Sequence, residues 1–192
     1  MESCLYAVQQ IRRLRGGSQA QLLRGSDGAY WVTKPQNNPQ HVRVLANEML
    51  ATRLGQLLRL PLPRVTGIEV AQWLIENTAD LRIDLSGSST YWKADLHLAS
   101  LYVADPCQGC VFDYLPDNLL EKVTNLRDFA RVLVLDRWTC NADGRQAVFS
   151  RRARGRSYSA SFIELGKRAS LLALSPLRTG RESFPSSGSS HV

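Results

Sequence analysis

The sequence predicts an α+β fold: a small antiparallel sheet with one long helix, followed by a more helical region that carries further strands. Two short runs flank a turn, residues 20–24 with a leucine pair and residues 29–34 with aromatic and β-branched side chains, which is typical of a β-hairpin. Apolar residues recur at helical spacing at residues 42–60 and again at residues 119–139.

The first 34 residues have the order strand, glycine-rich turn, strand, turn, strand. Residues 5–11 form a short apolar run, and Gly16-Gly17-Ser18 follows it as a turn, because adjacent glycines interrupt regular structure. The hairpin comes next, with its own turn at Gly25-Ser26-Asp27-Gly28. Three strands are therefore expected before residue 35.

Residues 42–60 carry the strongest helical pattern in the chain. Pro61 ends this helix, because a proline excludes the preceding residue from helical backbone. We expect a strand at residues 65–70, a short helix at residues 71–80 and a flexible connection at residues 86–90. The apolar residues that define the long helix are Val44, Leu45, Met49, Leu50, Leu54, Leu57 and Leu58.

Residues 109–115 combine a strand signal with a following turn, and a second helix is expected at residues 119–139, with Asn125 capping its later part. Strands are expected at residues 146–150 and 158–163. The apolar residues of the second helix are Leu126, Phe129, Val132, Leu133, Leu135 and Trp138.

Basic residues are concentrated at the C-terminal end of the 192-residue chain, whose formal net charge is +7. Residues 1–150 hold 16 basic and 15 acidic side chains, whereas residues 151–192 hold 8 basic and 2 acidic ones. A nucleic-acid-binding domain carries its positive charge along a folded face. Residues 1–150 are nearly neutral and do not indicate such a face. The arginines of residues 151–156 are the candidate contact for nucleic-acid phosphates, with a solvated basic loop as the alternative.

The sequence indicates a cytoplasmic protein with no membrane partner. No run approaches the roughly 18 apolar residues that a membrane helix needs, and the order of acidic and basic residues at the N-terminus is the reverse of a secretory signal. The cysteines are then expected to be free thiols. Cys107 and Cys110 form a single C-x-x-C without a second pair, so we interpret it as incidental rather than as a zinc or redox site.

A phosphate-binding element is one interpretation of Gly16-Gly17-Ser18-Gln19 together with Lys34. Glycines let backbone N–H groups approach phosphate oxygens, and a lysine adds a positive charge. Glu48 borders the apolar stripe of the long helix, from where a carboxylate can pair with a lysine on a neighbouring sheet. The alternatives are an ordinary turn, a surface lysine and a solvated glutamate. The chain has no P-loop motif.

Two further stretches carry acidic residues at spacings used in phosphoryl transfer. Asp136 and Asn141 have the D-x-x-x-x-N spacing in which a carboxylate accepts the substrate proton and an amide oxygen binds a metal, and Asp143 offers a second carboxylate. Glu164 ends a hydrophobic strand two residues before Gly166, where kinases bind magnesium. The alternatives are a helix end with turn residues and an ordinary strand end.

Taken in order, these signals resemble the HipA-like kinase family over roughly residues 8–166. The phrases that carry the resemblance are Gly-Gly-Ser-Gln, Trp-Val-Thr-Lys-Pro-Gln-Asn-Asn-Pro-Gln, Asn-Glu-Met-Leu-Ala-Thr-Arg-Leu, Trp-Thr-Cys-Asn-Ala-Asp-Gly-Arg-Gln-Ala-Val-Phe and Phe-Ile-Glu-Leu-Gly. The most specific of them is residues 141–149, and residues 34–40 come next.

The resemblance implies a two-lobed protein-kinase-like fold that transfers the γ-phosphoryl group of ATP, with Mg²⁺, to a Ser/Thr hydroxyl of a protein. It implies an N-lobe of residues 1–112, a hinge near residues 111–115 and a partial, helical C-lobe of residues 113–166, followed by a poorly structured basic, Ser-rich tail of residues 167–192. The residues it implies at the nucleotide are Gly16, Gly17, Ser18, Gln19, Lys34 and Glu48.

The resemblance leaves the catalytic base open between two registers. In the D-x-x-x-x-N register Asp136 is the base and Asn141 a metal ligand. In the Asn-x-Asp-x-His register Asp143 is the base, Arg145 replaces the histidine, and Gln146 or Asn141 takes the place of the metal-binding asparagine. We favour Asp143 slightly, because its phrase is the more family-specific one, and Glu164 is the remaining candidate metal ligand.

Two departures from the family pattern indicate an alternative, an inactive kinase-like binding module or a truncated remnant. Glu164 stands where the family has aspartate, and residues 167–192 do not resemble the remaining helices of a kinase C-lobe. An incomplete lobe leaves part of the apolar face of residues 126–138 uncovered, which favours association or instability. Nucleic-acid binding through residues 151–156 is the second alternative.

Overall fold

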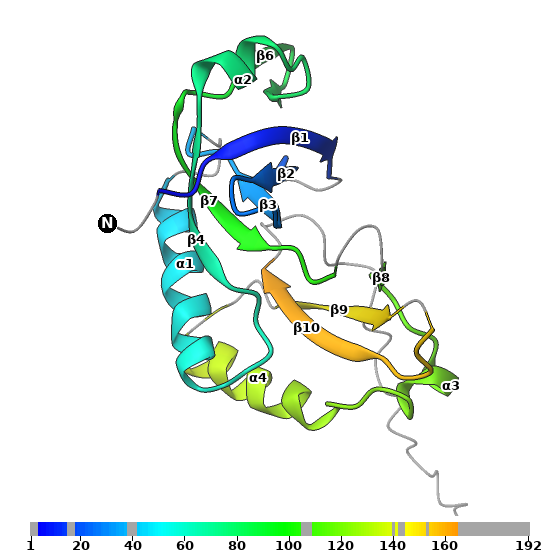
Figure 1. Ribbon diagram of the computed structural model, residues 1–192. Coiled ribbons are helices and arrows are strands. Elements are labelled where there is room, and N and C mark those ends of the chain that lie inside the picture. Colours follow the sequence, from blue (N-terminus) through cyan, green and yellow to red (C-terminus); the bar gives the residue numbers. More distant parts are fainter. Residues whose placement is uncertain are drawn as a thin grey trace, which may run out of the picture.

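The computed structural model describes residues 4–14, 18–37, 42–104, 109–139, 141, 145–152 and 154–164. Within these residues the fold is mixed α+β, as the sequence predicts, with a five-stranded, a three-stranded and a two-stranded sheet. The five-stranded sheet is flanked by the long helix α1 (Val42–Leu57), and the three-stranded sheet lies below it, beside helix α4 (Arg127–Trp138) (Figure 1).

The five-stranded sheet is antiparallel and has the order β1-β2-β3-β7-β4. Its strands are β1 (Ala7–Arg13), β2 (Gln21–Gly25), β3 (Tyr30–Lys34), β4 (Val65–Val70) and β7 (Asp95–Leu101). The predicted hairpin is confirmed as β2 and β3. An isolated bridge between Tyr6 and Glu69 joins the chain before β1 to β4, so the two edges of the sheet approach each other at that corner.

Three strands depart from the sequence prediction. A hairpin of β5 (Arg82–Leu85) and β6 (Ser88–Tyr91) replaces the flexible connection expected at residues 86–90. Its tight turn places Gly87 at φ +87°, a left-handed conformation that glycine adopts without steric penalty. Strand β7 was not expected at all, because its buried residues include the polar His97.

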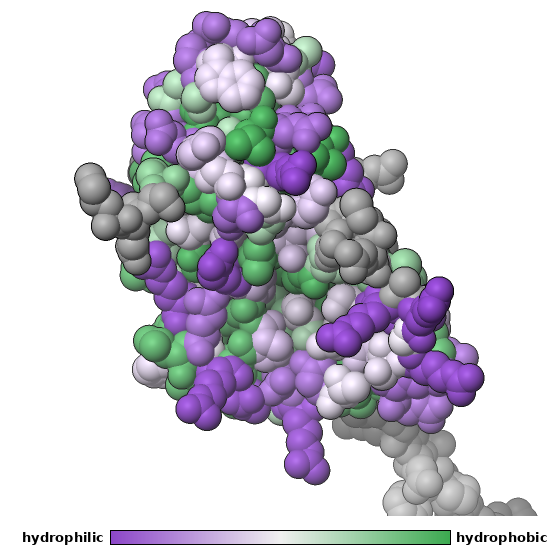
Figure 2. Space-filling view, viewed as in Figure 1, coloured by the Kyte–Doolittle hydropathy of each residue, from purple (hydrophilic) through white to green (hydrophobic). Residues whose placement is uncertain are grey.

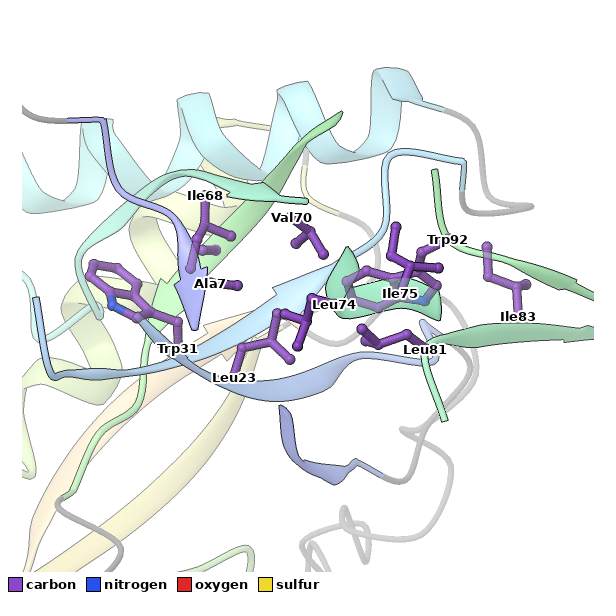
Figure 3. Close-up of a cluster of buried hydrophobic side chains, with 11 residues drawn as sticks. Ala7, Leu23, Trp31, Ile68, Val70, Leu74, Ile75, Leu81, Ile83 and Trp92 are labelled. Carbon is purple, nitrogen blue, oxygen red and sulfur yellow. The ribbon is translucent and has the colours of Figure 1, made fainter. Parts of the chain in front are cut away.

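The main hydrophobic core joins the five-stranded sheet to the elements between β4 and β7 (Figure 3). The sheet contributes Leu23, Trp31 and Ile68, all fully buried. The short helix α2 (Gln72–Glu76) confirms the predicted helix in shorter form and adds Leu74 and Ile75. Each fully buried side chain of this size stabilises the fold by about 1.5–3 kcal/mol.

The buried face of α1 differs from the predicted apolar stripe. Its buried residues are Leu45, Glu48, Thr52 and Gly55. Leu50 and Leu57, both assigned to the stripe, are 66% and 81% exposed. Hydrophobic periodicity predicts the wrong buried face of α1, because the middle of the true buried face is Glu48. The charge of this glutamate is balanced by Lys34 of β3.

The second part of the chain contains β8 (Gly109–Phe112), α3 (Asp117–Leu120), α4, β9 (Arg145–Arg152) and β10 (Ser159–Glu164). Its antiparallel sheet has the order β10-β9-β8. The predicted helix of residues 119–139 is broken into α3 and α4. Asn125 does not cap α4: its side-chain amide donates to the carbonyl of Ala160 at 2.9 Å and accepts from the amide of Ala160 at 2.9 Å, so it binds the edge of β10 instead.

The boundary between the two sheets lies earlier than the predicted hinge at residues 111–115. Strand β8 pairs with β9, with Val111 opposite Ser150, so it belongs to the second sheet. The chain therefore passes from the first sheet to the second between Leu101, the end of β7, and Gly109, the start of β8.

A second hydrophobic core lies between the three-stranded sheet, α4 and the residues that follow α1. Phe129 of α4 contacts the ring of Phe162 of β10 edge-on, with centroids 4.8 Å apart. At Gly55 of α1 an added Cβ would collide with Leu62 and would lie 2.9 Å from a methyl carbon of Leu135, so glycine permits the close approach of α1 to α4. The buried members of this core are Leu60, Leu62, Leu115, Val123, Val132, Leu135, Phe149, Ala160 and Phe162.

Helix α4 exposes much of the apolar face that the sequence predicts to be uncovered. Leu133, Val134 and Trp138 are 71%, 68% and 68% exposed. Trp138 and Val134 line a shallow cavity of about 320 Å³ with Leu58, which follows α1. No helix in the described part of the chain is long and apolar enough to cross a membrane.

Candidate functional site

A cavity of about 460 Å³ lies where the two larger sheets meet. Strands β1, β3 and β7 and helix α1 line it from one side, and β8, β9 and β10 line it from the other. Figure 2 shows apolar and neutral surface in the middle of the molecule, with polar side chains above and below it. We call this cavity the inter-sheet cleft.

Lys34 and Glu48 form a buried ion pair at the cleft. The Nζ of Lys34 lies 2.7 Å from Oε1 and 2.6 Å from Oε2 of Glu48, and the two side chains are 8% and 6% exposed. Lys34 is the last residue of β3, and Glu48 lies on the inward face of α1, which follows β3 in the chain. The structure thus brings together the lysine and the glutamate that the sequence suggests as partners.

The remaining walls of the cleft combine apolar surfaces with a few polar groups. Apolar side chains line both sides of the cleft: Ala20, Val32, Leu101, Val103, Val111, Val148 and Phe162. The polar side chains are mostly basic on the β1 side, Arg12 and Arg13, whereas Asp113 and Gln146 lie on the other side. This arrangement suits a ligand that has an apolar part and an anionic part.

The glycine-rich turn is only partly described. Gly16 and Gly17 lie outside the described residues, and Ser18 lines the cleft. Gln19, a predicted nucleotide contact, is not among the described lining residues. Its side-chain amide is engaged by the backbone of Asp84 and by Arg13, so it points to the β5–β6 hairpin.

Asp136, one of the two candidate bases, is engaged in a structural ion pair. Its Oδ1 accepts hydrogen bonds from Nε of Arg145 at 2.8 Å and from Nδ2 of Asn141 at 3.1 Å. The Arg145 side chain is 1% exposed and that of Asp136 is 11% exposed. Neither Asp136 nor Asn141 is among the described residues that line the cleft. In this geometry the carboxylate of Asp136 balances the charge of the buried Arg145 guanidinium.

The other acidic candidates lie outside what the structure describes. Asp143 is among the undescribed residues, and nothing is described of the side chain of Glu164, whose backbone ends β10. Gln146, a candidate metal ligand, does line the cleft, and its amide donates to the carbonyl of Asp113 at 3.4 Å. The described residues contain no cluster of three or more His, Cys, Asp or Glu side chains that could hold a metal ion.

Sequence reasoning missed several polar groups at the cleft, among them Arg12, Tyr102 and Asp113. The guanidinium of Arg12 donates to the hydroxyl of Tyr102 at 3.3 Å, which links β1 to the segment that leaves β7. The two-residue alternation of Leu96 and Leu98 could have revealed β7 and hence the place of Tyr102. No local pattern reveals Asp113.

His97 supports the backbone that follows Lys34. Its Nδ1 accepts a hydrogen bond from the amide of Gln36 at 2.9 Å, so the proton of the neutral ring lies on Nε2, which donates to the carbonyl of Lys93 at 2.9 Å. Burial lowers the pKa of His97, although the Lys93 carbonyl and the Asp95 charge oppose this shift. His97 is therefore neutral near pH 7.

The remaining motifs are not assembled into a site by the described residues. Arg151 is held over the rings of Phe112 and Tyr158, at 6.0 and 5.7 Å from their centroids. Cys4 and Cys110 are exposed free thiols, and Cys107 lies outside the described residues. Comparison of the chain with protein-family models, with curated proteins and with solved structures finds no match.

Proposed function

We propose that this chain is a HipA-like kinase domain with a two-lobed protein-kinase-like fold, whose inter-sheet cleft binds ATP. The observation that carries the proposal is the buried Lys34–Glu48 pair at the cleft. In protein kinases a glycine-rich loop covers the phosphates, and a lysine of the third strand pairs with a glutamate of the next helix. The same order of elements is present here.

The cleft supplies the parts that nucleotide binding needs. Its apolar walls accept the adenine ring, and Lys34, held in place by Glu48, contacts the phosphates. Gly16 and Gly17 provide backbone N–H groups that cover the phosphates. Mg²⁺ would neutralise phosphate charge, with Asn141, Gln146 and Glu164 as its candidate ligands.

The proposed reaction is phosphoryl transfer to a Ser/Thr hydroxyl of a protein. Asp143 takes the hydroxyl proton as the oxygen attacks the γ-phosphorus, and the bond to the β,γ-bridging oxygen breaks to release ADP. We assign the base to Asp143 because Asp136 is occupied by Arg145. A cytoplasmic location is part of the proposal, since ATP and reduced cysteines such as Cys4 are found there.

A thermal-shift experiment tests nucleotide binding. Mg-ATP at about 100 times its dissociation constant should stabilise the protein by about 2.7 kcal/mol. A double variant, Lys34→Met with Glu48→Leu, replaces the buried pair by apolar side chains and should show no shift. Absence of stabilisation of the wild type at millimolar Mg-ATP would contradict the proposal.

A second candidate function is nucleotide binding without transfer. The observation that favours it is that Asp136 is engaged by Arg145, which leaves the two catalytic carboxylates to Asp143 and Glu164, the latter longer than the family's aspartate. Nucleotide-dependent stabilisation without labelling of any protein from [γ-³²P]ATP, unchanged in Glu164→Asp, would support this candidate against the kinase.

A further inference from the structure

Gln19 ties the end of the glycine-rich turn to the β5–β6 hairpin. Its Nε2 donates to the carbonyl of Asp84 at 2.7 Å, and its Oε1 accepts from the amide of Asp84 at 2.7 Å. The side chain therefore pairs with the backbone of β5 as a neighbouring strand would. These contacts join residues that are 65 positions apart in the chain.

Arg13 makes a second tie from the other end of the turn. Its guanidinium lies 2.7 Å from Oδ2 of Asp84 and donates to Oε1 of Gln19 at 2.8 Å. Arg13 ends β1, and Gln19 stands just before β2. Between them the amide of Leu14 donates to the carbonyl of Ala20 at 2.9 Å, which closes the base of the turn. Both ends of the turn thus meet at one residue of the hairpin.

The backbone of Gln19 indicates that these contacts are needed to hold it. Its φ is +49°, in the left-handed region that costs a residue with a side chain about 1–2 kcal/mol. Such conformations persist where surrounding contacts determine them. The bonds to Asp84 and Arg13 are the contacts that do so.

The hairpin itself has a fixed base and an exposed tip. Leu81 and Ile83 are fully buried in the main core, and the latter belongs to β5 (Figure 3). Gln21 adds a bond from its Nε2 to the carbonyl of Asp80 at 2.8 Å. By contrast, all four residues of β6 are exposed. A two-stranded hairpin is marginally stable alone, so its order depends on these anchors.

We propose that the β5–β6 hairpin is a latch that fixes the described ends of the glycine-rich turn, so that Arg13 and Ser18 stay at the cleft that they line, with Gln19 and Arg13 as positioning residues. This inference rests on the proposed nucleotide-binding function.

Two measurements on the full chain test the latch: amide exchange of Leu14 by NMR without nucleotide, and Mg-ATP affinity by calorimetry. Gln19→Ala and Asp84→Ala should each speed exchange of the Leu14 amide and weaken Mg-ATP binding by about 5-fold or more. Amides of β7 should keep their protection, which separates the effect from general destabilisation. Gln19→Glu keeps the acceptor and loses the donor, so it should lie between the wild type and Gln19→Ala.

Arg82→Ala is the matched control. Arg82 lies on the same strand and contacts Asp84 at a longer distance of 3.7 Å, but it makes no hydrogen bond or ion pair with the described residues of the turn, so both readouts should stay at the wild-type level. Charge exchange provides the rescue: Arg13→Asp should speed Leu14 exchange, and adding Asp84→Arg should restore its protection.

Three outcomes are decisive. Unchanged Leu14 exchange in Gln19→Ala and Asp84→Ala would overturn the latch. Faster exchange with unchanged Mg-ATP affinity would overturn its link to the cleft. If the wild type binds no nucleotide, the proposed function fails while Leu14 exchange still decides whether the hairpin holds the turn.

Discussion

Lys34 and Glu48 face each other across the junction between β3 and α1, and each carboxylate oxygen of Glu48 lies within 2.7 Å of the Lys34 Nζ. Both side chains are nearly excluded from solvent. A charged pair so buried is balanced only while both members are present, since loss of one leaves the other uncompensated. The pair therefore determines both the seating of α1 on the sheet and the charge at the cleft.

Single and double substitutions separate these two roles. Lys34→Met should lower the free energy of unfolding by about 3–5 kcal/mol, because Glu48 is left buried without a partner. Adding Glu48→Leu should return most of that stability, and Mg-ATP binding should stay absent. Urea unfolding and calorimetry measure the two quantities. A double variant that still binds nucleotide would contradict the role of Lys34.

Asp136 and Asp143 should respond oppositely to substitution. Asp136→Ala should lower the free energy of unfolding by roughly 3 kcal/mol, because Arg145 loses a buried carboxylate. Asp143→Asn should leave stability near the wild-type value and abolish phosphoryl transfer. Thermal melts and radiolabel transfer distinguish the two, and full transfer activity in Asp143→Asn would return the base to Asp136.

Acidification should destabilise the protein through His97. Burial lowers the pKa of His97 in the folded state, so below its ordinary value of about 6.5 the unfolded chain binds more protons than the folded one. The contribution of neutral His97 is present above pH 6.5 and is lost as the pH falls toward the lowered pKa. Melting temperatures from pH 8 to pH 5 should fall in the wild type and fall less in His97→Gln. Parallel profiles for the two proteins would contradict this assignment.

Gly55 should not tolerate a branched side chain. Gly55→Val should lower the free energy of unfolding by about 1–3 kcal/mol, because the added atoms overlap Leu62 and Leu135. Arg53→Val, on an exposed position of the same helix, is the control for the helix propensity of valine. Since valine is a better helix former than glycine, a Gly55→Val variant as stable as the wild type in urea unfolding would show that Gly55 is not in close contact with Leu62 and Leu135.

The exposed apolar face of α4 should bind an apolar dye in the folded state. Trp138→Gln should reduce the fluorescence enhancement of anilinonaphthalene sulfonate with little change in melting temperature, because Trp138 is 68% exposed. Leu85→Gln, at an exposed leucine of the hairpin, is a control for the loss of one surface apolar group. Dye binding that persists in Trp138→Gln and falls in Leu85→Gln would place the dye site elsewhere.

Local sequence patterns predict the helices and strands that are determined by residues close together in the chain. The β2–β3 hairpin follows from its turn residues and the apolar runs on either side of them, and α1 follows from its periodicity and Pro61. By contrast, β5 and β6 are held by Ile83 in a distant core and by the turn at Gly87, so a serine-rich stretch that looks flexible in sequence is ordered. Strand β7 was missed because a buried histidine interrupts its apolar pattern.

The candidate site follows the same division. The Lys34–Glu48 contact could be expected, because the residue types and their elements limit the partners that either can reach. The contacts of Asp136 and Gln19 could not be expected. Asp136 is bound by Arg145, which lies across a turn, and Gln19 is bound by Asp84, which is far away in the chain. Motif spacing indicates which residues could take part in catalysis. Their contacts in the folded chain decide which of these residues are already bound to other side chains.

The position of the crossing between the two sheets has a practical consequence for splitting the protein. All strand pairs of the described residues lie on one side or the other of residues 105–108. Dividing the chain there would leave each sheet intact. The two halves could still bind each other through contacts between them, such as the amide of Phe162 with the carbonyl of Pro61 and the guanidinium of Arg131 with the carbonyl of Leu58. Because the inter-sheet cleft draws its walls from both halves, it would form only on reassociation, and fragment complementation would then report on the cleft itself.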